Sequence, residues 1–244
     1  MLKEISLYRG EVKLSVDIDE DKHDCFDSNG NKIPYSVTGA TGVIDKSGAL
    51  MGWVAKMMGL YLLAEKEKGN CQITEEMIAR AKKEYRLLRQ EAADLGTEIH
   101  KWVSDWIKGK NPTMPIDERV VNGITAFLKF QKEHKVKWLE SERIIYSKEY
   151  NYWGVLDAIG KINGKLVLVD FKSSSGIYPE MYFQTAGYQI AFEEETGKKI
   201  AKRIICKFGK EDGQFEVKEL NCDEEDKEAF LSALTLKRRL DQVK

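Results

Sequence analysis

The feature that most constrains this chain is the dipeptide Asn163-Gly164, which lies between two runs of β-forming residues. Asn-Gly is the strongest short signal for a β-hairpin, because both positions of a type I′ turn need positive φ angles. If Ile162 pairs with Lys165, Asp157 falls directly opposite Asp170, at a non-hydrogen-bonded pair where side chains lie about 4.5–5.5 Å apart. The sequence therefore predicts two facing carboxylates on one antiparallel hairpin.

This pair of carboxylates predicts a bound cation, because like charges directly opposite each other repel. Hard oxygen ligands favour Mg²⁺ or Mn²⁺ over zinc. Lys172 follows Asp170 by two residues and projects to the same face of the strand, whereas Phe171 points to the core. Two carboxylates and an ammonium on one face suit phosphodiester hydrolysis, with the metal polarising the phosphate and the lysine orienting water or stabilising charge. The hairpin alone leaves open a plain surface ladder with an Asp–Lys ion pair.

The periodicity of the remaining sequence predicts an α/β (α+β) chain with a helical N-terminal half. Residues 1–38 alternate as strands do, and residues 47–134 have helical spacing, with a pause expected at Leu95-Gly96. Further along the chain, we expect β-strands within 138–172, a helix from Pro179 to Gly197, strands at 203–208 and 214–220, and a charged C-terminal helix.

Composition excludes some classes of protein. The 39 basic and 40 acidic residues give a net charge of −1, which argues against a strongly basic coat protein but allows an enzyme with a local basic surface. No run of 18 apolar residues occurs, so no membrane-spanning helix is expected, and the N-terminus lacks the pattern of a signal peptide. No C-x-x-C pair is present, so we expect reduced thiols rather than a zinc ribbon.

Several short motifs resemble those of the PD-(D/E)XK nuclease superfamily, in its RecB-like exonuclease branch. The motifs are Gly154-x-x-Asp157, Asp170-Phe171-Lys172 and Gln184-x-x-x-Tyr188, preceded by Gly96-x-x-x-His100 and Glu142. Tyr35-Ser36-Val37-Thr38 and Leu50-Met51-Gly52-Trp53 resemble the start of phage-encoded and mitochondrial genome-maintenance exonucleases. The resemblance covers residues 34–208 and departs at Leu156, where the named pattern has proline.

This resemblance implies a restriction-endonuclease-like core, with a central mixed sheet flanked by helices. Residues 1–244 would form a single nuclease domain. Its N-terminal strands and helical part would be 1–135, its catalytic αβββαβ core 136–210, and its last strand and helix 211–244.

The resemblance also implies a role for each motif residue. Mg²⁺, with Mn²⁺ as a substitute, would be bound by His100, Asp157, Asp170 and the backbone carbonyl of Phe171. Lys172 would be the catalytic lysine, and Glu142 an outer-shell or second-metal carboxylate. Gln184 and Tyr188 lie at i, i+4 on one helix face and would hold the lysine or the DNA. Ser36 and Thr38 would bind a backbone phosphate of the DNA.

The function implied is a metal-dependent DNA exonuclease that acts on single-stranded or end-exposed DNA in recombination, repair or replication. Its location would be the cytoplasm of a bacterial or phage-infected cell. A structure- or site-specific endonuclease of the same fold and a catalytically inactive DNA-binding module are the alternatives. No iron–sulfur cluster is expected, because the four cysteines do not have the spacing of the iron–sulfur members of the branch; they are Cys25, Cys71, Cys206 and Cys222.

Two basic runs are candidates for a DNA-binding surface, with ordinary solvated faces as the alternative. They are Lys82, Lys83, Arg86 and Arg89, and Lys198, Lys199, Lys202 and Arg203. Four aromatic residues near the motifs could stack on unpaired bases, although we expect all but one of them in the core. These are Trp102, Trp106, Tyr152 and Trp153.

Overall fold

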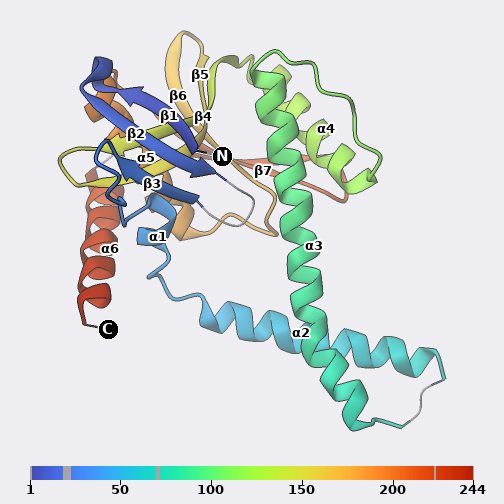
Figure 1. Ribbon diagram of the computed structural model, residues 1–244. Helices are drawn as coiled ribbons and strands as arrows, with labels where there is room; N and C mark the ends of the chain where they lie inside the picture. Colours follow the sequence, from blue (N-terminus) through green and yellow to red (C-terminus); the bar gives the residue numbers. More distant parts are fainter. Residues whose placement is uncertain (1, 19–22, 70–71, 223, 244) are drawn as a thin grey trace. The chain divides into compact units, whose positions relative to one another are not determined.

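The computed structural model describes residues 2–18, 23–69, 72–222 and 224–243 (Figure 1). The chain forms two compact units, one of Met1–Ile44 with Ile99–Lys244 and the other of Asp45–Glu98. The described residues form six α-helices, a mixed five-stranded sheet and an antiparallel three-stranded sheet. The predicted mixed α/β fold class is confirmed.

The first unit is built on the five-stranded sheet, whose strands lie in chain order. They are β4 (Lys137–Ser147), β5 (Tyr152–Ile162), β6 (Lys165–Lys172), β7 (Lys202–Phe208) and β8 (Phe215–Leu220). Asn163 and Gly164 have φ angles of 50° and 77°, as a type I′ turn requires. Only β6 and β7 pair in parallel, because helix α5 (Pro179–Thr196) makes the crossover between them.

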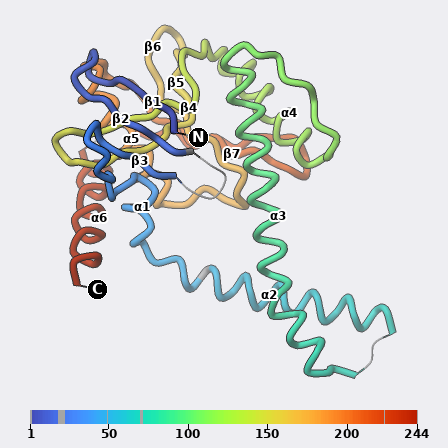
Figure 2. The backbone as a smooth tube through the Cα atoms, viewed as in Figure 1, coloured from blue at the N-terminus to red at the C-terminus, as the bar shows by residue number. Residues whose placement is uncertain are grey.

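Three helices cover one face of this sheet. They are α1 (Val37–Thr41), α5 and α6 (Glu224–Gln242); α5 packs along α6, and α1 contacts both (Figure 2). Helix α5 begins at Pro179, which suits a first turn, and ends before Gly197, whose φ of 67° terminates the helix. Buried Leu168, Phe192 and Phe230 belong to the core between these helices and the sheet.

A three-stranded meander and one helix pack against the opposite face of the sheet. A meander of β1 (Leu2–Leu7), β2 (Val12–Ile18) and β3 (His23–Asp27), with a short 3₁₀ helix at Tyr8–Gly10, packs its buried Val16 and Cys25 against Ile144 and Trp153. Helix α4 (Glu118–Glu133) contacts β7 and β8, and its Phe127 packs against Phe171 and Phe208. Asp117 caps α4, with its side chain accepting a hydrogen bond from the amide of Arg119.

Helix α3 (Glu75–Ile107) runs unbroken for 33 residues. The pause expected at Leu95-Gly96 is wrong, because one glycine costs a helix only about 1 kcal/mol and does not break a long amphipathic segment. The last part of α3, from Ile99 onward, belongs to the first unit and includes His100.

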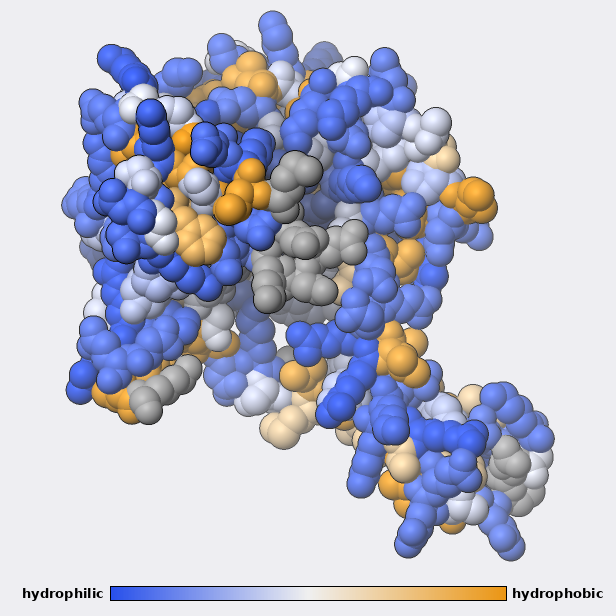
Figure 3. Space-filling view, viewed as in Figure 1, coloured by the Kyte–Doolittle hydropathy of each residue, from blue (hydrophilic) through white to orange (hydrophobic). Residues whose placement is uncertain are grey.

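The second unit consists of α2 (Ser47–Glu67) and the first part of α3. Thr74 caps α3, and its hydroxyl oxygen accepts a 3.2 Å hydrogen bond from the amide of Met77. Trp53 and Tyr85 meet edge to face. Large apolar side chains of this unit are exposed, and orange patches interrupt its blue surface in Figure 3; they are Leu50, Met51, Leu60, Leu63, Ile73, Ile78 and Leu87.

Among the described helices, none combines the length and the apolar character needed to cross a membrane.

Candidate active site

The predicted hairpin register is confirmed up to the point where the two strands separate. Pairing of β5 with β6 runs from Ile162–Lys165 to Ala158–Val169. It ends one pair before Asp157 and Asp170, which therefore do not form the closed ladder pair that the sequence predicts. Instead, the amide of Phe171 donates a 2.7 Å hydrogen bond to Oδ2 of Asp157. This side-chain contact links β5 and β6 beyond the point where their backbone pairing ends.

The regular pleat of β5 also breaks at Asp157. Leu156 and Ile159 pack into the same core cluster although three positions separate them, whereas strict alternation would place them on opposite faces. On the neighbouring strand, Glu142 has a φ of 49°, and the partners of its two chain neighbours flank Asp157. The hydroxyl of Ser141 donates to the carbonyl of Asp157 at 3.1 Å. Both strands thus depart from regular geometry around this carboxylate.

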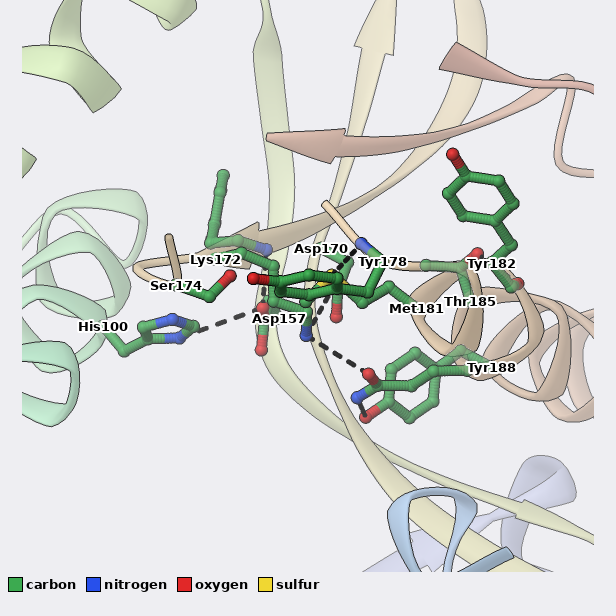
Figure 4. Close-up of polar contacts among 12 residues, drawn as sticks. His100, Asp157, Asp170, Lys172, Ser174, Tyr178, Met181, Tyr182, Thr185 and Tyr188 are labelled. Atoms are coloured by element: carbon green, nitrogen blue, oxygen red, sulfur yellow. Dashed lines mark hydrogen bonds and ion pairs between the residues drawn. The ribbon is translucent and has the colours of Figure 1, made fainter. Parts of the chain in front are cut away.

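Four side chains form a chain of contacts from β6 to α5 (Figure 4). Nζ of Lys172 lies 2.7 Å from Oδ2 of Asp170 and donates to Oε1 of Gln184 at 3.2 Å. The amide nitrogen of Gln184 in turn donates to the hydroxyl of Tyr188 at 2.8 Å. Because Gln184 and Tyr188 are one turn apart on α5, that helix fixes where the lysine ammonium lies.

Burial shifts the pKa values of the ionisable side chains in this chain of contacts. Desolvation raises the pKa of the Asp170 carboxyl to about 6, with Asp157 adding to the rise and Lys172 and His100 opposing it. Burial alone would lower the pKa of Lys172, but attraction to Asp170 and Asp157 outweighs it, so the net shift is upward. Burial raises the pKa of Tyr188 well above its ordinary value, which keeps its hydroxyl protonated.

His100 reaches the same carboxylates from α3. Its Nδ1 lies 3.8 Å from Oδ2 of Asp157, and its ring meets the edge of Phe171 at 6.4 Å between centroids. Its side chain is 33% exposed, so a ligand can approach it. The structure therefore brings together six of the predicted residues: His100, Asp157, Asp170, Lys172, Gln184 and Tyr188.

The donors fit a hard divalent cation in type, but they do not enclose one. Among the residues that the structure describes, no three His, Cys, Asp or Glu side chains converge closely enough to hold a metal ion as they stand. However, His100 and Asp157 lie within electrostatic range of Asp170. The Oδ2 atom of Asp170 is buried and makes no regular hydrogen bond, with only the ammonium of Lys172 beside it. Carboxylate oxygens in such a setting are suitable ligands for Mg²⁺.

Glu142 points to a different partner. Its carboxylate forms a 2.7 Å ion pair with Lys108, at the C-terminal end of α3, and its side chain is about half exposed. The two residues line a groove with parts of β1 and β4. Its predicted role at the metal stays a prediction. Sequence reasoning missed Lys108 and Ser141, because no local pattern links either residue to the hairpin.

Ser36 and Thr38 lie at the start of α1, where Oγ of Ser36 accepts from the amide of Gly39 at 3.0 Å. Helix α1 lies close to β5 and α5 at Gly154. A Cβ added to Gly154 would lie 2.9 Å from the side chain of Tyr188 and 3.0 Å from that of Val37. Only glycine allows this approach of α1, β5 and α5. Phosphate binding by the two hydroxyls stays a prediction.

One candidate for the DNA-binding surface is wrong. Arg203 is fully buried; its guanidinium donates to the carbonyls of Tyr182 and Asn221 and pairs with Asp226, because alternation on β7 directs it inward. Lys199 and Lys202 are ion-paired with Glu193 and Glu219. The first basic run lies exposed on α3. As expected, three of the four aromatic residues are buried, and Trp106 is half-buried.

The structure describes three of the four cysteines. Cys25 and Cys206 are buried and Cys222 is partly buried, all three as free thiols, while Cys71 lies outside the described residues. The absence of an iron–sulfur cluster stays a prediction.

No family model and no curated protein sequence matches this chain. Among solved structures, it is similar to LHK-Exo, an alkaline exonuclease from Laribacter hongkongensis, at 14% identity over 87% of this chain and 95% of that one, with a TM-score of 0.39. A complex of LHK-Exo with dAMP gives the same identity and TM-score, over 86% and 94% of the two chains. A protein from Eubacterium rectale, provisionally named an exonuclease, is 13% identical over 84% and 78%, with a TM-score of 0.44.

These neighbours are exonucleases by name.

Proposed function

We propose that this protein is a divalent-metal-dependent deoxyribonuclease, acting as an exonuclease on single-stranded or end-exposed DNA. One observation carries the proposal: Asp157, Asp170 and Lys172 converge where β5 and β6 separate, with His100 and Gln184 reaching them from two helices. A surface ladder would leave these charges exposed, but Asp170 is 1% exposed and Lys172 only 19%. Burying charges is costly unless each has a partner, so a site with a chemical task accounts for them best.

His100, Asp157, Asp170 and the carbonyl of Phe171 would hold Mg²⁺ or Mn²⁺. A bound cation of this kind polarises a phosphoryl oxygen and lowers the pKa of a bound water. The carboxylate of Asp157 is oriented for this task by the amide of Phe171, and that of Asp170 by burial beside Lys172.

Lys172 would place its ammonium against the phosphate that is attacked. Hydrolysis adds water across the bond between phosphorus and the leaving oxygen, and negative charge builds on the phosphoryl oxygens during attack. A fixed ammonium stabilises that charge or orients the attacking water. Gln184 holds Nζ in position, and Tyr188 holds Gln184. Glu142 would act at the rim of the site, and Ser36 and Thr38 would contact a DNA phosphate farther along the strand.

The same proposal includes the process and the compartment in which the protein acts. The motif resemblance favours recombination, repair or replication of DNA in the cytoplasm of a bacterial or phage-infected cell.

The test is digestion of end-labelled oligonucleotides, single- and double-stranded, with Mg²⁺, Mn²⁺ or EDTA. We expect stepwise loss of nucleotides from a free end with metal and none with EDTA. A covalently closed circular single strand should stay intact; its cleavage would identify an endonuclease instead. Metal binding measured by calorimetry, with no cleavage of any substrate, would leave an inactive binding module. The Asp170→Asn variant, purified in parallel, controls for contaminating nucleases.

A further inference from the structure

Tyr178 presents an aromatic ring at the edge of the proposed active site. It lies at the N-terminal end of α5, on the loop that follows Lys172. The residue is 40% exposed, whereas Tyr188 on the same helix is 3% exposed. The close-up in Figure 4 includes Tyr178 among the residues around Asp157, Asp170 and Lys172, at the end of α5 nearest the loop that follows β6. Its ring is therefore accessible to a ligand, whereas that of Tyr188 is enclosed in the core.

Contacts on one side hold this ring in place. A Cβ added to Gly176 would lie 3.3 Å from both Cζ and the hydroxyl oxygen of Tyr178, so the ring lies against the glycine backbone. The hydroxyl shares a 2.9 Å hydrogen bond with Ser175. The backbone amide of Tyr178 donates to the sulfur of Met181 at 3.4 Å. The ring is thus supported and oriented, and a substantial part of it stays open to solvent.

The loop beneath the ring is tied to the catalytic strands. The hydroxyl of Ser174 donates to the carbonyl of Gly176 at 2.8 Å. Nζ of Lys207 donates to the carbonyl of Ser175 at 3.4 Å, and Lys207 is the β7 partner of Lys172 in the parallel ladder. A ring anchored in this way loses little conformational freedom when it binds a ligand, which favours tight contact.

On the basis of the proposed nuclease function, we propose that Tyr178 stacks on an unpaired nucleobase beside the phosphodiester bond to be cleaved. Aromatic side chains bind single strands in this way without sequence preference, because every base has a π face. A base inside a duplex is already stacked on its neighbours. The site would therefore favour single-stranded or frayed ends, and Tyr178 would set that preference.

The experiment compares Tyr178→Leu, Tyr178→Phe and a matched control, Tyr182→Leu. The ring of Tyr182 lies on the same helix but points away from the carboxylates, under Lys218 at 5.9 Å (Figure 4). Each variant is assayed for kcat/KM on single-stranded oligonucleotides and blunt duplexes with Mg²⁺, after its unfolding midpoint has been checked. We expect Tyr178→Leu to lower kcat/KM on single strands about tenfold, and less on duplexes. Tyr178→Phe and Tyr182→Leu should stay near the wild-type value.

An abasic scan separates stacking from a merely structural effect. Removing the base at one position near the labelled end should slow the wild type by a similar factor, and should cause no further loss in Tyr178→Leu. If the wild type cleaves DNA but the two losses multiply, or Tyr178→Leu equals the wild type, the stacking role is overturned and the nuclease function stands.

A fluorescence measurement tests stacking even if the protein does not cleave DNA. If the wild type cleaves no substrate, quenching of 2-aminopurine fluorescence in a single-stranded oligonucleotide reports stacking directly. Quenching by the wild type and by Tyr178→Phe, but not by Tyr178→Leu, supports the role of Tyr178 even in a protein that does not cleave. Equal quenching by all three proteins overturns it.

Discussion

The two ends of the β5–β6 hairpin differ in every respect that matters for function. At the turn end, the ladder from Ile162–Lys165 to Ala158–Val169 is regular, and Leu168 and Val169 are fully buried. At the open end, the ladder stops and the strands carry Asp157 and Asp170. Regular pairing satisfies backbone groups with one another, so it leaves no polar group for a ligand. The break leaves carboxylates and an ammonium that need partners from outside the hairpin.

We therefore expect changes at the open end to affect chemistry and changes at the turn end to affect only stability.

Asp170→Asn should lower cleavage at least about a thousandfold, because it removes a charged metal ligand while keeping the shape of the side chain. Single-turnover cleavage of a labelled oligonucleotide with saturating Mg²⁺ measures the loss. Circular dichroism of the purified variant establishes that the fold is intact. A folded variant with activity within tenfold of the wild type would remove Asp170 from the site.

Lys172→Met should lower cleavage about 10²–10³-fold and also destabilise the fold. It leaves Asp170 as an unpaired buried carboxylate, which costs about 3 kcal/mol in free energy of unfolding near pH 8 in metal-free buffer. The double variant Asp170→Asn/Lys172→Met should recover most of that stability but none of the activity, as chemical denaturation can measure.

The destabilisation by Lys172→Met should depend on pH. Burial already raises the pKa of Asp170 to about 6, and loss of the ammonium raises it further. A carboxyl whose pKa is raised by folding favours the folded state only while it is protonated. The loss of free energy of unfolding caused by Lys172→Met should therefore grow as pH rises through 6, and it should vanish below about 4, where Asp170 is protonated in both states. A deficit independent of pH would place the cause elsewhere than Asp170.

His100→Gln should lower cleavage about 10- to 100-fold at fixed Mg²⁺ and shift the metal titration to higher concentration. The imidazole reaches Asp157 from α3, so its loss weakens the site without breaking the hairpin. His134→Gln is the matched control, since His134 caps α4 and packs against Phe130 and Phe215. Equal metal titrations for both variants would exclude His100 as a ligand.

Gly164→Ala should leave cleavage per folded molecule unchanged and lower the free energy of unfolding by about 1–2 kcal/mol. Gly164 has a φ of 77° and no neighbour within 4 Å of an added Cβ, so the cost is backbone strain alone. Loss of activity in the folded variant would show that the turn end affects the geometry of the site, which would contradict a role in stability alone.

Local signals in the sequence predicted most of the elements correctly. Pro179 and Gly197 bound α5, and Asn163-Gly164 forms the turn. Each signal works through the backbone angle or hydrogen bond of a single residue, so it needs no knowledge of distant parts of the chain.

Two features that the sequence did not reveal, the burial of Arg203 and the partner of Glu142, have a common cause in packing. Arg203 belongs to a basic run that looks like surface, but it follows Lys202 on a strand, and alternation turns it into the core. The pairing of Lys108 with Glu142 depends on where α3 ends beside β4. These outcomes follow from how elements dock, which local propensity does not encode.

From the residues alone, Asp157 and Asp170 could be placed near each other on one hairpin with Lys172 on the same strand as Asp170, because a two-residue turn fixes the register. The break of the ladder before this pair, and the approach of His100 from α3 and Gln184 from α5, follow from tertiary packing. The two features depend on interactions over different distances along the chain. Register is set by neighbours along a hairpin, whereas the position of a helix is set by apolar contacts with residues far away in the chain.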